Sequence, residues 1–293
     1  MKILLTGAKG QLGQDCTKVL ATEYTVLHAF GSQELDITNS RLVTEMLQII
    51  NPDIVINCAA YTGVDGCESD KERCWRVNAD GPGFIAAGCA QIGARFIHIS
   101  TDFVFDGRKT VPDAYTEKDQ VRPVSEYGSS KLAGEERIRE KTDDHLIVRT
   151  AWLYGIGSTN FFKTMLRLAI SNPRQTIRVV HDQFGSLTWT YRLARQIKVL
   201  LEKELKGTVH ATAEGYCSWY EGAKYFLECM EVPHLIEPCT TAEYPTPAQR
   251  PANSILQNQR LTQHGINCMK PWKQDVASFV AQYRDALLAE AGE

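Results

Sequence analysis

Short apolar runs alternate with longer amphipathic stretches through the first half of the chain. The runs are rich in β-branched residues and have the length of buried strands, whereas the longer stretches repeat apolar residues at helical spacing, as at Leu12, Cys16 and Val19. The predicted strands are 2–6, 24–30, 53–60, 95–100 and 145–150, and the predicted helices lie at 11–23, 41–50, 72–93 and 129–141. This alternation predicts an α/β fold, a Rossmann-like doubly wound parallel sheet with helices on both faces.

The pattern is less regular after about residue 150. Candidate strands lie at 176–182 and 208–214, helical spacing recurs at 191–205 and 218–230, and 239–256 is a Pro-rich loop. We therefore predict a dinucleotide-binding Rossmann domain over 1–150 and a smaller α/β substrate-binding domain mainly over 151–293. Parts of 175–205 and 238–258 are expected to return to the first domain, so the two are interleaved.

Composition narrows the class of partner. The 293 residues include 43% hydrophobic and 23% charged side chains, typical of a globular protein. The net charge of −3, with both signs mixed along the chain, gives no argument for nucleic acid or a membrane surface as the main partner. A small-molecule substrate fits better. The start MKILLTGAKG resembles neither a signal peptide nor a spanning helix, so a cytoplasmic location is expected.

Cysteine and histidine spacing does not support a metal site. The nine cysteines include no Cys-x-x-Cys pair and the seven histidines no His-x-x-x-His pair. We interpret the cysteines as reduced thiols of the core and predict no bound metal.

A glycine-rich stretch, TGAKGQLG, follows the first predicted strand and opens the first predicted helix. Gly7, Gly10 and Gly13 lie where backbone amides at a helix start can bind a pyrophosphate, although glycines also serve plain tight turns. Near His28–Phe30, where an acid often binds the ribose of NAD, the strand carries none, and Asp36 is the first candidate. Lys9 would suit a 2′-phosphate about as well as it suits a solvated surface. The balance favours NADPH, with NADH as an alternative.

Tyr127 and Lys131 are one helical turn apart, where the helix predicted around 129–141 begins. Both side chains therefore project from one face, and an ammonium beside a phenol lowers the phenol's pKa, which makes the tyrosine usable for proton transfer. Thr101 ends the strand before them, at the edge where such sheets bind ligands. A Tyr-x-x-x-Lys pair alone also occurs on ordinary surface helices, but its order after the glycine loop and Thr101 favours a catalytic site.

These motifs resemble the extended short-chain dehydrogenase/reductase family, and within it the dTDP-4-dehydrorhamnose reductases. The resemblance runs over nearly the whole chain, through TGAKGQLG, LDIT, NCAAYTGVD with Glu68, VNAD, STDFVFDG, YGSSKLAGE, RTAWLYG, NFFKTML, VVHDQFGSLT and RPANSIL. It implies NADPH-dependent reduction of the C4 keto group of dTDP-6-deoxy-L-lyxo-4-hexulose, a nucleotide-sugar, to dTDP-L-rhamnose. It also implies a homodimer as one assembly state.

The resemblance assigns roles to individual residues. Thr101, Tyr127 and Lys131 would be catalytic. The cofactor would be bound by Gly7, Gly10, Gln11, Leu12, Gly13, Asp36, Ile37, Ala59, Ala60 and Tyr61, together with Tyr127 and Lys131. The substrate would be bound by Thr101, Asp102, Phe103, Trp152, Asn160, Gln183, Ser186 and Arg250. An aromatic face suits the apolar side of a pyranose, and an Arg fork suits a diphosphate.

Some positions depart from the family's pattern. TGVDGCESD carries Gly63, Gly66 and Cys67 at unusual places, Leu187 replaces a usual Pro, and 256–261 lacks a common Asp. Some members bind magnesium at a dimer interface, and Asp15 falls at one such position, but no matching partners are found.

Two alternatives differ in class. A related nucleotide-sugar 4-ketoreductase, an epimerase or a dehydratase shares the same motifs, but a dehydratase would carry an acid after Asp102, where this chain has Phe103. A non-catalytic regulator related to the regulatory subunit of methionine adenosyltransferase is disfavoured by the intact Thr101, Tyr127 and Lys131.

Overall fold

Six parallel strands form one sheet in the computed structural model, which describes residues 1–24 and 26–292. The strands are β1 (Lys2–Thr6), β2 (Val26–Phe30), β3 (Ile54–Asn57), β4 (Arg95–Thr101), β5 (His145–Thr150) and β10 (Gly207–His210), in the order β10-β5-β4-β3-β1-β2. Residue 25, part of the predicted strand 24–30, lies outside the described residues. The predicted Rossmann-like parallel sheet is confirmed.

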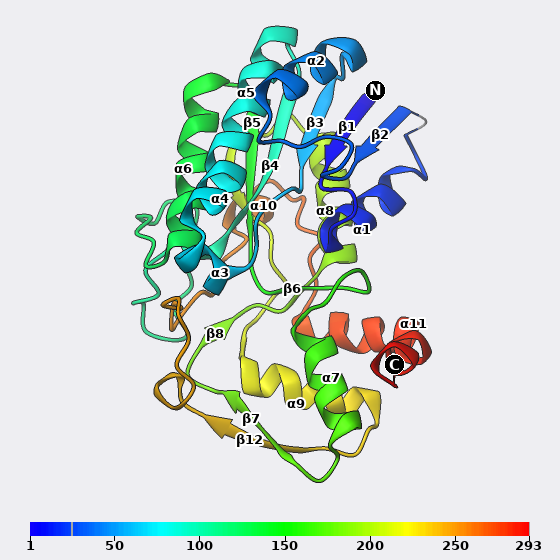
Figure 1. Cartoon of the computed structure of the whole chain (residues 1–293), viewed down its shortest axis with the longest axis vertical. Coiled ribbons are helices and arrows are strands. Elements are labelled where there is room, and N and C mark those ends of the chain that lie inside the picture. Colours follow the sequence, from blue (N-terminus) through cyan, green and yellow to red (C-terminus); the bar gives the residue numbers. More distant parts are fainter. Residues whose placement is uncertain (25, 293) are drawn as a thin grey trace.

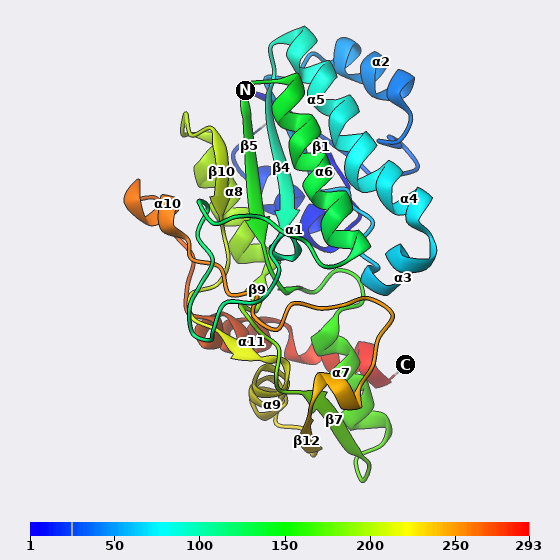
Figure 2. The same cartoon turned by 90° about the vertical axis from the view of Figure 1, so that its left-hand side faces the viewer.

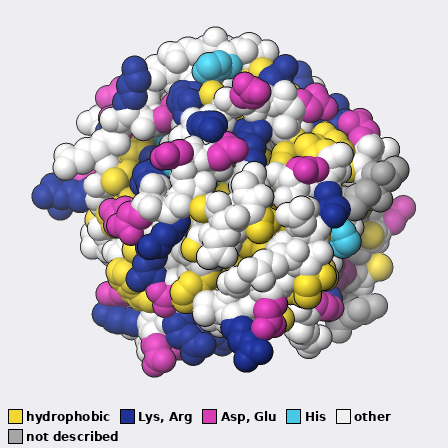
Figure 3. Space-filling view, turned by 90° about the horizontal axis from the view of Figure 1, so that it is seen from above, with side chains coloured by type: hydrophobic (Ala, Val, Ile, Leu, Met, Phe, Trp, Pro, Cys, Tyr) yellow, Lys and Arg dark blue, Asp and Glu magenta, His cyan; other side chains and the backbone are white. Residues whose placement is uncertain are grey.

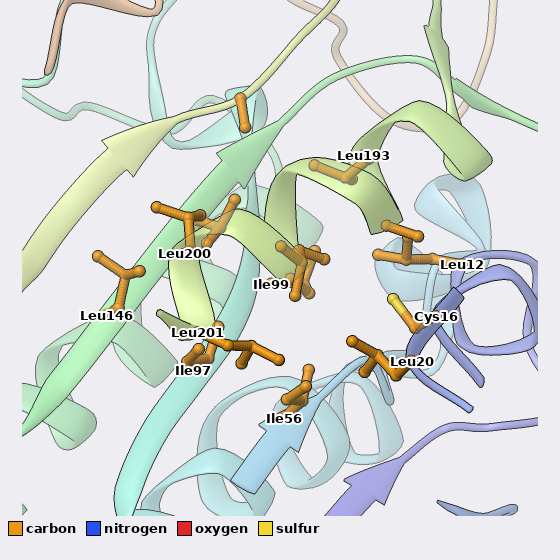
Figure 4. Packing of buried hydrophobic residues seen from close by; sticks show 14 of the residues in the cluster. Leu12, Cys16, Leu20, Ile56, Ile97, Ile99, Leu146, Leu193, Leu200 and Leu201 are labelled. Atoms are coloured by element: carbon orange, nitrogen blue, oxygen red, sulfur yellow. The ribbon is translucent and has the colours of Figure 1, made fainter. Parts of the chain in front are cut away.

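Helices cover both faces of this sheet (Figures 1 and 2). Along β1, Ile3 and Leu5 belong to one apolar cluster and Leu4 to the other, because successive side chains of a strand point to opposite faces. The first cluster is closed by α1 (Gln11–Leu20) and α8 (Thr190–Leu201), and Figure 4 shows its packing. The second is closed by α2 (Ser40–Ile50), α5 (Gly81–Ile92) and α6 (Glu126–Lys141). The strands are apolar in nearly every residue because both faces are buried.

The predicted helix 72–93 is wrong as a single helix. The chain instead forms α3 (Val64–Ser69), α4 (Lys71–Trp75), a π-helical turn η1 (Arg76–Asp80) and then α5. α6 lies against this turn so closely that a Cβ on Gly134 would be 2.2 Å from the Asn78 carbonyl oxygen. Single π-turns inside helices often mark functional sites, and here the turn contains Asn78, which supports a loop of the site.

A second lobe has its own apolar core. Its helices are α7 (Phe161–Ser171), α9 (Trp219–Met230) and α11 (Trp272–Gly292), which pack around Phe162, Phe226 and Phe279. Its strands form pairs: β7 (Thr176–Val180) with β12 (Leu235–Cys239), β8 (Phe184–Gly185) with β11 (Cys217–Ser218), and β6 (Leu153–Tyr154) with β9 (Thr188–Trp189). The Pro-rich loop contains one short turn, η3 (Thr241–Glu243). Of the helices in the described part of the chain, none is long and apolar enough to cross a bilayer.

The chain passes between the lobes several times. After β6, α7 and β7 in the second lobe, α8 returns to the first sheet and β10 becomes its edge strand, followed later by α10 (Gln259–Gln263). The range expected to return, 175–205, contains α8, whereas β10 lies just beyond it. On the face in Figure 3, acidic and basic side chains are interspersed, in keeping with the mixed charge along the sequence.

Candidate active site

The glycine turn lies where the order of the sheet strands reverses. β2 lies on one side of β1 and β3 on the other, and ligands of open α/β sheets bind at the carboxyl ends of the strands at such a point. Gly7 has a φ of +73°, and a Cβ there would lie 2.5 Å from the Ala59 backbone nitrogen. A Cβ on Gly13 would lie 2.0 Å from the Gly7 carbonyl oxygen. The turn therefore requires glycine, and it packs directly on the loop that follows β3.

The start of α1 suits a phosphate. Its N-cap residue is Gly10, so no side chain caps the first amides of the helix, at Gln11 and Leu12. The glycine turn is so tight that a single Cβ at Gly7 or Gly13 would clash with the backbone, and the helix start beside it has free amides. Both features fit the binding of a dinucleotide's pyrophosphate.

The loop after β3 is held by two buried asparagines. The side-chain oxygen of Asn57 accepts a hydrogen bond from the Ala59 amide at 3.0 Å. Asn78 from η1 accepts from the Tyr61 amide at 2.9 Å and donates to the Tyr61 carbonyl at 3.0 Å. The predicted cofactor residues Ala59, Ala60 and Tyr61 are thus fixed beside the glycine turn.

Glu34 is an acid that the strand pattern did not identify. It lies four residues after the end of β2, and a turn brings its carboxylate back to Gly31, next to that strand end. Its carboxylate accepts from the Gly31 amide at 3.0 Å and pairs with Lys9 at 2.5 Å. The strand end itself carries no acid, as predicted, but Asp36 is not the first acid after it, because Glu34 comes earlier. Asp36 accepts from the Thr38 amide at 2.9 Å, and the side chain of Ile37 is buried in the core.

The carboxyl end of β4 places a buried hydroxyl and carboxyl side by side. The Thr101 hydroxyl donates to Asp102 Oδ1 at 2.9 Å and accepts from the Phe103 amide at 3.2 Å. Asp102 starts the short turn η2 (Asp102–Val104), and burial raises the pKa of its carboxyl to about 6. The ring of Phe103 meets the Tyr127 ring edge-on, with centroids 5.4 Å apart. The structure therefore brings Thr101, Asp102 and Phe103 next to Tyr127.

The first turn of α6 carries Tyr127 and is anchored at both sides. Ser125 caps the helix by accepting from the Gly128 amide at 3.2 Å, and Glu68 from α3 accepts from the Glu126 amide at 2.9 Å. Gly128 permits close packing, since a Cβ there would be 2.3 Å from the Phe103 carbonyl oxygen. The Ser125 cap and the bond from Glu68 hold the first turn of α6 in place, and with it the Tyr127 phenol.

Burial sets the protonation of the Tyr–Lys pair. Burial raises the pKa of Tyr127, and the neighbouring Thr101 hydroxyl lowers it by less. Burial lowers the pKa of Lys131 to about 8. The amine of Lys131 donates to the Ile99 carbonyl at 2.7 Å and lies 3.2 Å from His98 Nε2. The expectation of a lowered pKa for Tyr127 is wrong for this structure, because burial outweighs the groups that favour the phenolate. A phenol with a raised pKa is fully protonated, which suits a proton donor.

Two of the predicted substrate residues lie where the lobes meet. Trp152 has a φ of +48° and stacks on Trp219, with ring centroids 3.6 Å apart and planes at 7°. Asn160 caps α7 and donates to the Gln11 side chain at 2.8 Å, so it joins the second lobe to the start of α1. Trp219 was not identified as a site residue from the sequence, because its place beside the site depends on the stack with Trp152.

The other predicted substrate residues have partners within the protein. Gln183 donates to the Thr241 hydroxyl at 3.0 Å, and Ser186 donates to the Gly215 carbonyl at 2.7 Å. Arg250 binds the Asp65 carboxylate through both terminal nitrogens, at 2.8 and 3.1 Å. The contact of these three residues with a substrate stays a prediction.

A doubly wound sheet, a glycine turn at its switch point, and Thr101, Tyr127 and Lys131 at the end of β4 and on α6 define the class of short-chain dehydrogenases/reductases. Comparisons with known proteins specify the family. The family described as "RmlD substrate binding domain" matches residues 1–285. The chain belongs to this family, that of the dTDP-4-dehydrorhamnose reductases.

Individual relatives are similar over nearly the whole chain. The Bacillus subtilis spore coat polysaccharide biosynthesis protein SpsK is 38% identical over 97% of this chain and 99% of its own. The Escherichia coli dTDP-4-dehydrorhamnose reductase is 37% identical over 94% of this chain and 96% of its own. The Clostridium acetobutylicum dTDP-4-dehydrorhamnose reductase structure has a TM-score of 0.93 at 39% identity, covering 97% of this chain and 100% of its own. The Bacillus anthracis one, solved in complex with NADP, has 0.92 at 38%, covering 96% and 100%.

Proposed function

We propose that this protein reduces the C4 keto group of dTDP-6-deoxy-L-lyxo-4-hexulose with NADPH and forms dTDP-L-rhamnose. The observation that carries the proposal is the meeting of a protonated, buried Tyr127 with the Thr101 hydroxyl, on the sheet edge that also holds the glycine turn. The relatives named dTDP-4-dehydrorhamnose reductase support the substrate, and the relative solved with NADP supports the cofactor.

Each side chain has a role that follows from its setting. NADPH, when bound, supplies the hydride. Tyr127 donates its phenolic proton to the oxygen that was the ketone, and Thr101 hydrogen-bonds the same oxygen. Lys131, fixed by the Ile99 carbonyl, holds the ribose side of the cofactor and stabilises the phenolate left by proton transfer. Gly7, Gly10 and Gly13 bind the pyrophosphate.

Contacts to the nucleotide-sugar complete the proposal. Arg250 binds the diphosphate through its fork, sharing the guanidinium with Asp65, and Trp152 contacts the deoxysugar beside Trp219. A homodimer and a cytoplasmic location belong to the same proposal, and light scattering after size-exclusion chromatography tests the first.

Replacement of the phenol tests the chemistry. We expect Tyr127→Phe to lower kcat by about 10²- to 10⁴-fold, because the proton donor is lost. The Kd of NADP⁺ should stay within about threefold, since the glycine turn is untouched. Turnover is followed by NADPH oxidation on dTDP-glucose converted by the two preceding pathway enzymes, with sugar analysis of the product.

Tyr244→Phe, on an exposed tyrosine, is the matched control and should keep full activity. Retained turnover in Tyr127→Phe would exclude the assigned proton donor. Product without NADPH consumption, from protein isolated with tightly held NAD, would instead indicate an epimerase.

A further inference from the structure

A line of buried polar side chains runs from the sheet to Lys131. Thr6 donates to Asn57 Oδ1 at 2.6 Å, Asn57 Nδ2 lies 3.0 Å from His98 Nδ1, and His98 Nε2 lies 3.2 Å from Lys131 Nζ. Asn57 and His98 are fully buried, and Lys131 is 1% exposed. Because these side chains are buried, each N–H donor in the line needs an acceptor within the protein.

The orientation of Asn57 is fixed by its neighbours. Its Oδ1 accepts the Ala59 backbone N–H, a group that can only donate, at 3.0 Å. Its Nδ2, which also can only donate, must then face His98 Nδ1. A flipped amide would place two N–H groups against each other at Ala59.

The single proton of the neutral His98 ring can therefore lie on Nδ1, facing Asn57, or on Nε2, facing Lys131. Burial, and then the nearby Lys131, lower the pKa of His98 well below its usual value, so the ring is neutral and carries one proton. When His98 Nδ1 accepts from Asn57, the proton sits on Nε2 and points at Lys131. An ammonium has no lone pair to receive it, whereas a neutral amine accepts it and still donates to the Ile99 carbonyl at 2.7 Å.

We propose that His98, oriented by Asn57, is a positioning residue that couples the proton on Lys131 to its own tautomer. With a neutral amine, His98 is protonated on Nε2 and every contact in the line is satisfied. When Lys131 takes up one proton from solvent, the ring's proton moves from Nε2 to Nδ1, so the ring stays neutral and accepts from the ammonium. The Asn57 contact is then lost, which favours the neutral amine.

Other ionisable groups around Lys131 come from several elements. Glu135 lies one turn further along α6, Cys58 follows β3, Cys74 belongs to α4, and Tyr127 lies one turn earlier. Glu135 is held by Arg149 and Ser100, so its charge is already compensated. The kinetic consequence, a Lys131 that deprotonates closer to neutral pH, rests on the proposed function, whereas the tautomer change does not.

Nitrogen-15 NMR of the histidine-labelled protein tests the coupling without any turnover. The His98 signals are those missing from a His98→Gln variant. Between pH 6 and 10 we expect the ring to change from the Nδ1–H to the Nε2–H tautomer as Lys131 loses its proton. One unchanged tautomer over this whole range would overturn the proposal.

Asn57→Asp reverses the polarity of the contact with little change of shape. Thr6, Ala59 and His98 Nδ1–H can all donate to a carboxylate, so His98 should stay in the Nδ1–H form at every pH. The alkaline limb of kcat/KM for NADPH should move up by about one to two pH units. A purely Coulombic effect would shift the tautomer change to higher pH without abolishing it, and would count against the proposal.

The two proposals fail separately. If the His98 tautomer does not change with pH while reductase activity is intact, only the proposed coupling is refuted. If Tyr127→Phe retains turnover, only the assigned proton donor is refuted. If Asn57→Asp does not fold, the titration of the unmodified protein still decides.

Discussion

Glu135 is a fully buried carboxylate one helical turn beyond Lys131. It accepts from the Ser100 hydroxyl at 2.6 Å and from two nitrogens of Arg149 at 2.8 and 2.6 Å. Burial by itself raises the pKa of this carboxyl, but the bidentate bond with the buried Arg149 outweighs it and lowers the pKa to about 2. Through these bonds Glu135 joins α6 to Ser100 of β4 and to Arg149 of β5, next to the site.

Glu135→Gln should destabilise the protein by about 3 kcal/mol at pH 7, because it leaves the Arg149 charge buried and unpaired. A depressed carboxyl pKa stabilises the fold above the unfolded value near 4.5, and this contribution is lost as pH falls toward 2. The variant should therefore lose much of the wild type's pH dependence between about 4.5 and 2. Urea unfolding at pH 7 and at pH 3 measures both effects.

Glu45→Gln is the matched control, since Glu45 pairs with Arg41 at 2.7 Å on an exposed helix surface. Solvent screens such a pair, and little change in the free energy of unfolding is expected. Equal losses in the two variants would show that the buried pair is not what stabilises α6.

The residues of the candidate site differ in how far the sequence reveals them. Tyr127, Lys131 and Thr101 were predictable because their meaning lies in local spacing, one helical turn or one strand end. His98 and Trp219 were not, because one depends on Asn57 in a neighbouring strand and the other on a stack with a distant tryptophan. Their significance arises from contacts between different elements, and such contacts cannot be inferred from a single sequence.

The glycine turn is the element through which the chain can bind a dinucleotide. Gly7→Ala should weaken NADP⁺ binding on the order of tenfold or more, because the new Cβ would meet the Ala59 backbone at 2.5 Å and displace the turn. Gly93→Ala is a matched control, since Gly93 also has a positive φ, +70°, but no atom of the described residues lies within 4 Å of its Cβ position.

Both substitutions should cost about 1–2 kcal/mol from the left-handed backbone alone. Only Gly7→Ala should lower cofactor affinity, measured by calorimetric titration with NADP⁺. Equal affinity in the two variants would mean that the turn does not contact the pyrophosphate.

At the scale of elements, three of the parallel strands were predicted close to their true bounds, whereas the predicted 53–60 and 208–214 run past the ends of β3 and β10. A strand buried on both faces reads as an unbroken apolar run, so the predicted 2–6, 95–100 and 145–150 match β1, β4 and β5 to within a residue. The helix over 72–93 was not predicted correctly, because the π-turn at 76–80 is stabilised by packing against Gly134 of α6 and leaves no mark in the apolar spacing.

At the scale of the molecule, the two lobes are joined by more than their sequence order. Tyr191, at the start of α8, packs on both the sheet core and the core of the second lobe. Thr190 directly follows β9 of the second lobe and donates to the buried Asp15 of α1 at 2.5 Å, and Asn160 bonds Gln11 at 2.8 Å. Both bonds end on the helix that follows the glycine turn, so the cofactor region and the second lobe share one helix.

We therefore expect a single cooperative unfolding transition in scanning calorimetry, with van't Hoff and calorimetric enthalpies equal. NADP⁺ at about 100 times its Kd should add about 2.7 kcal/mol to the free energy of unfolding, and the whole transition should move to higher temperature, because loss of either lobe would release α1. Asn160→Ala, which removes the bond to Gln11 but not that of Thr190, should lower the midpoint without splitting the peak. Two resolved peaks in the unmodified protein, of which NADP⁺ moves only one, would mean that the lobes unfold independently and that the shared contacts on α1 do not couple them.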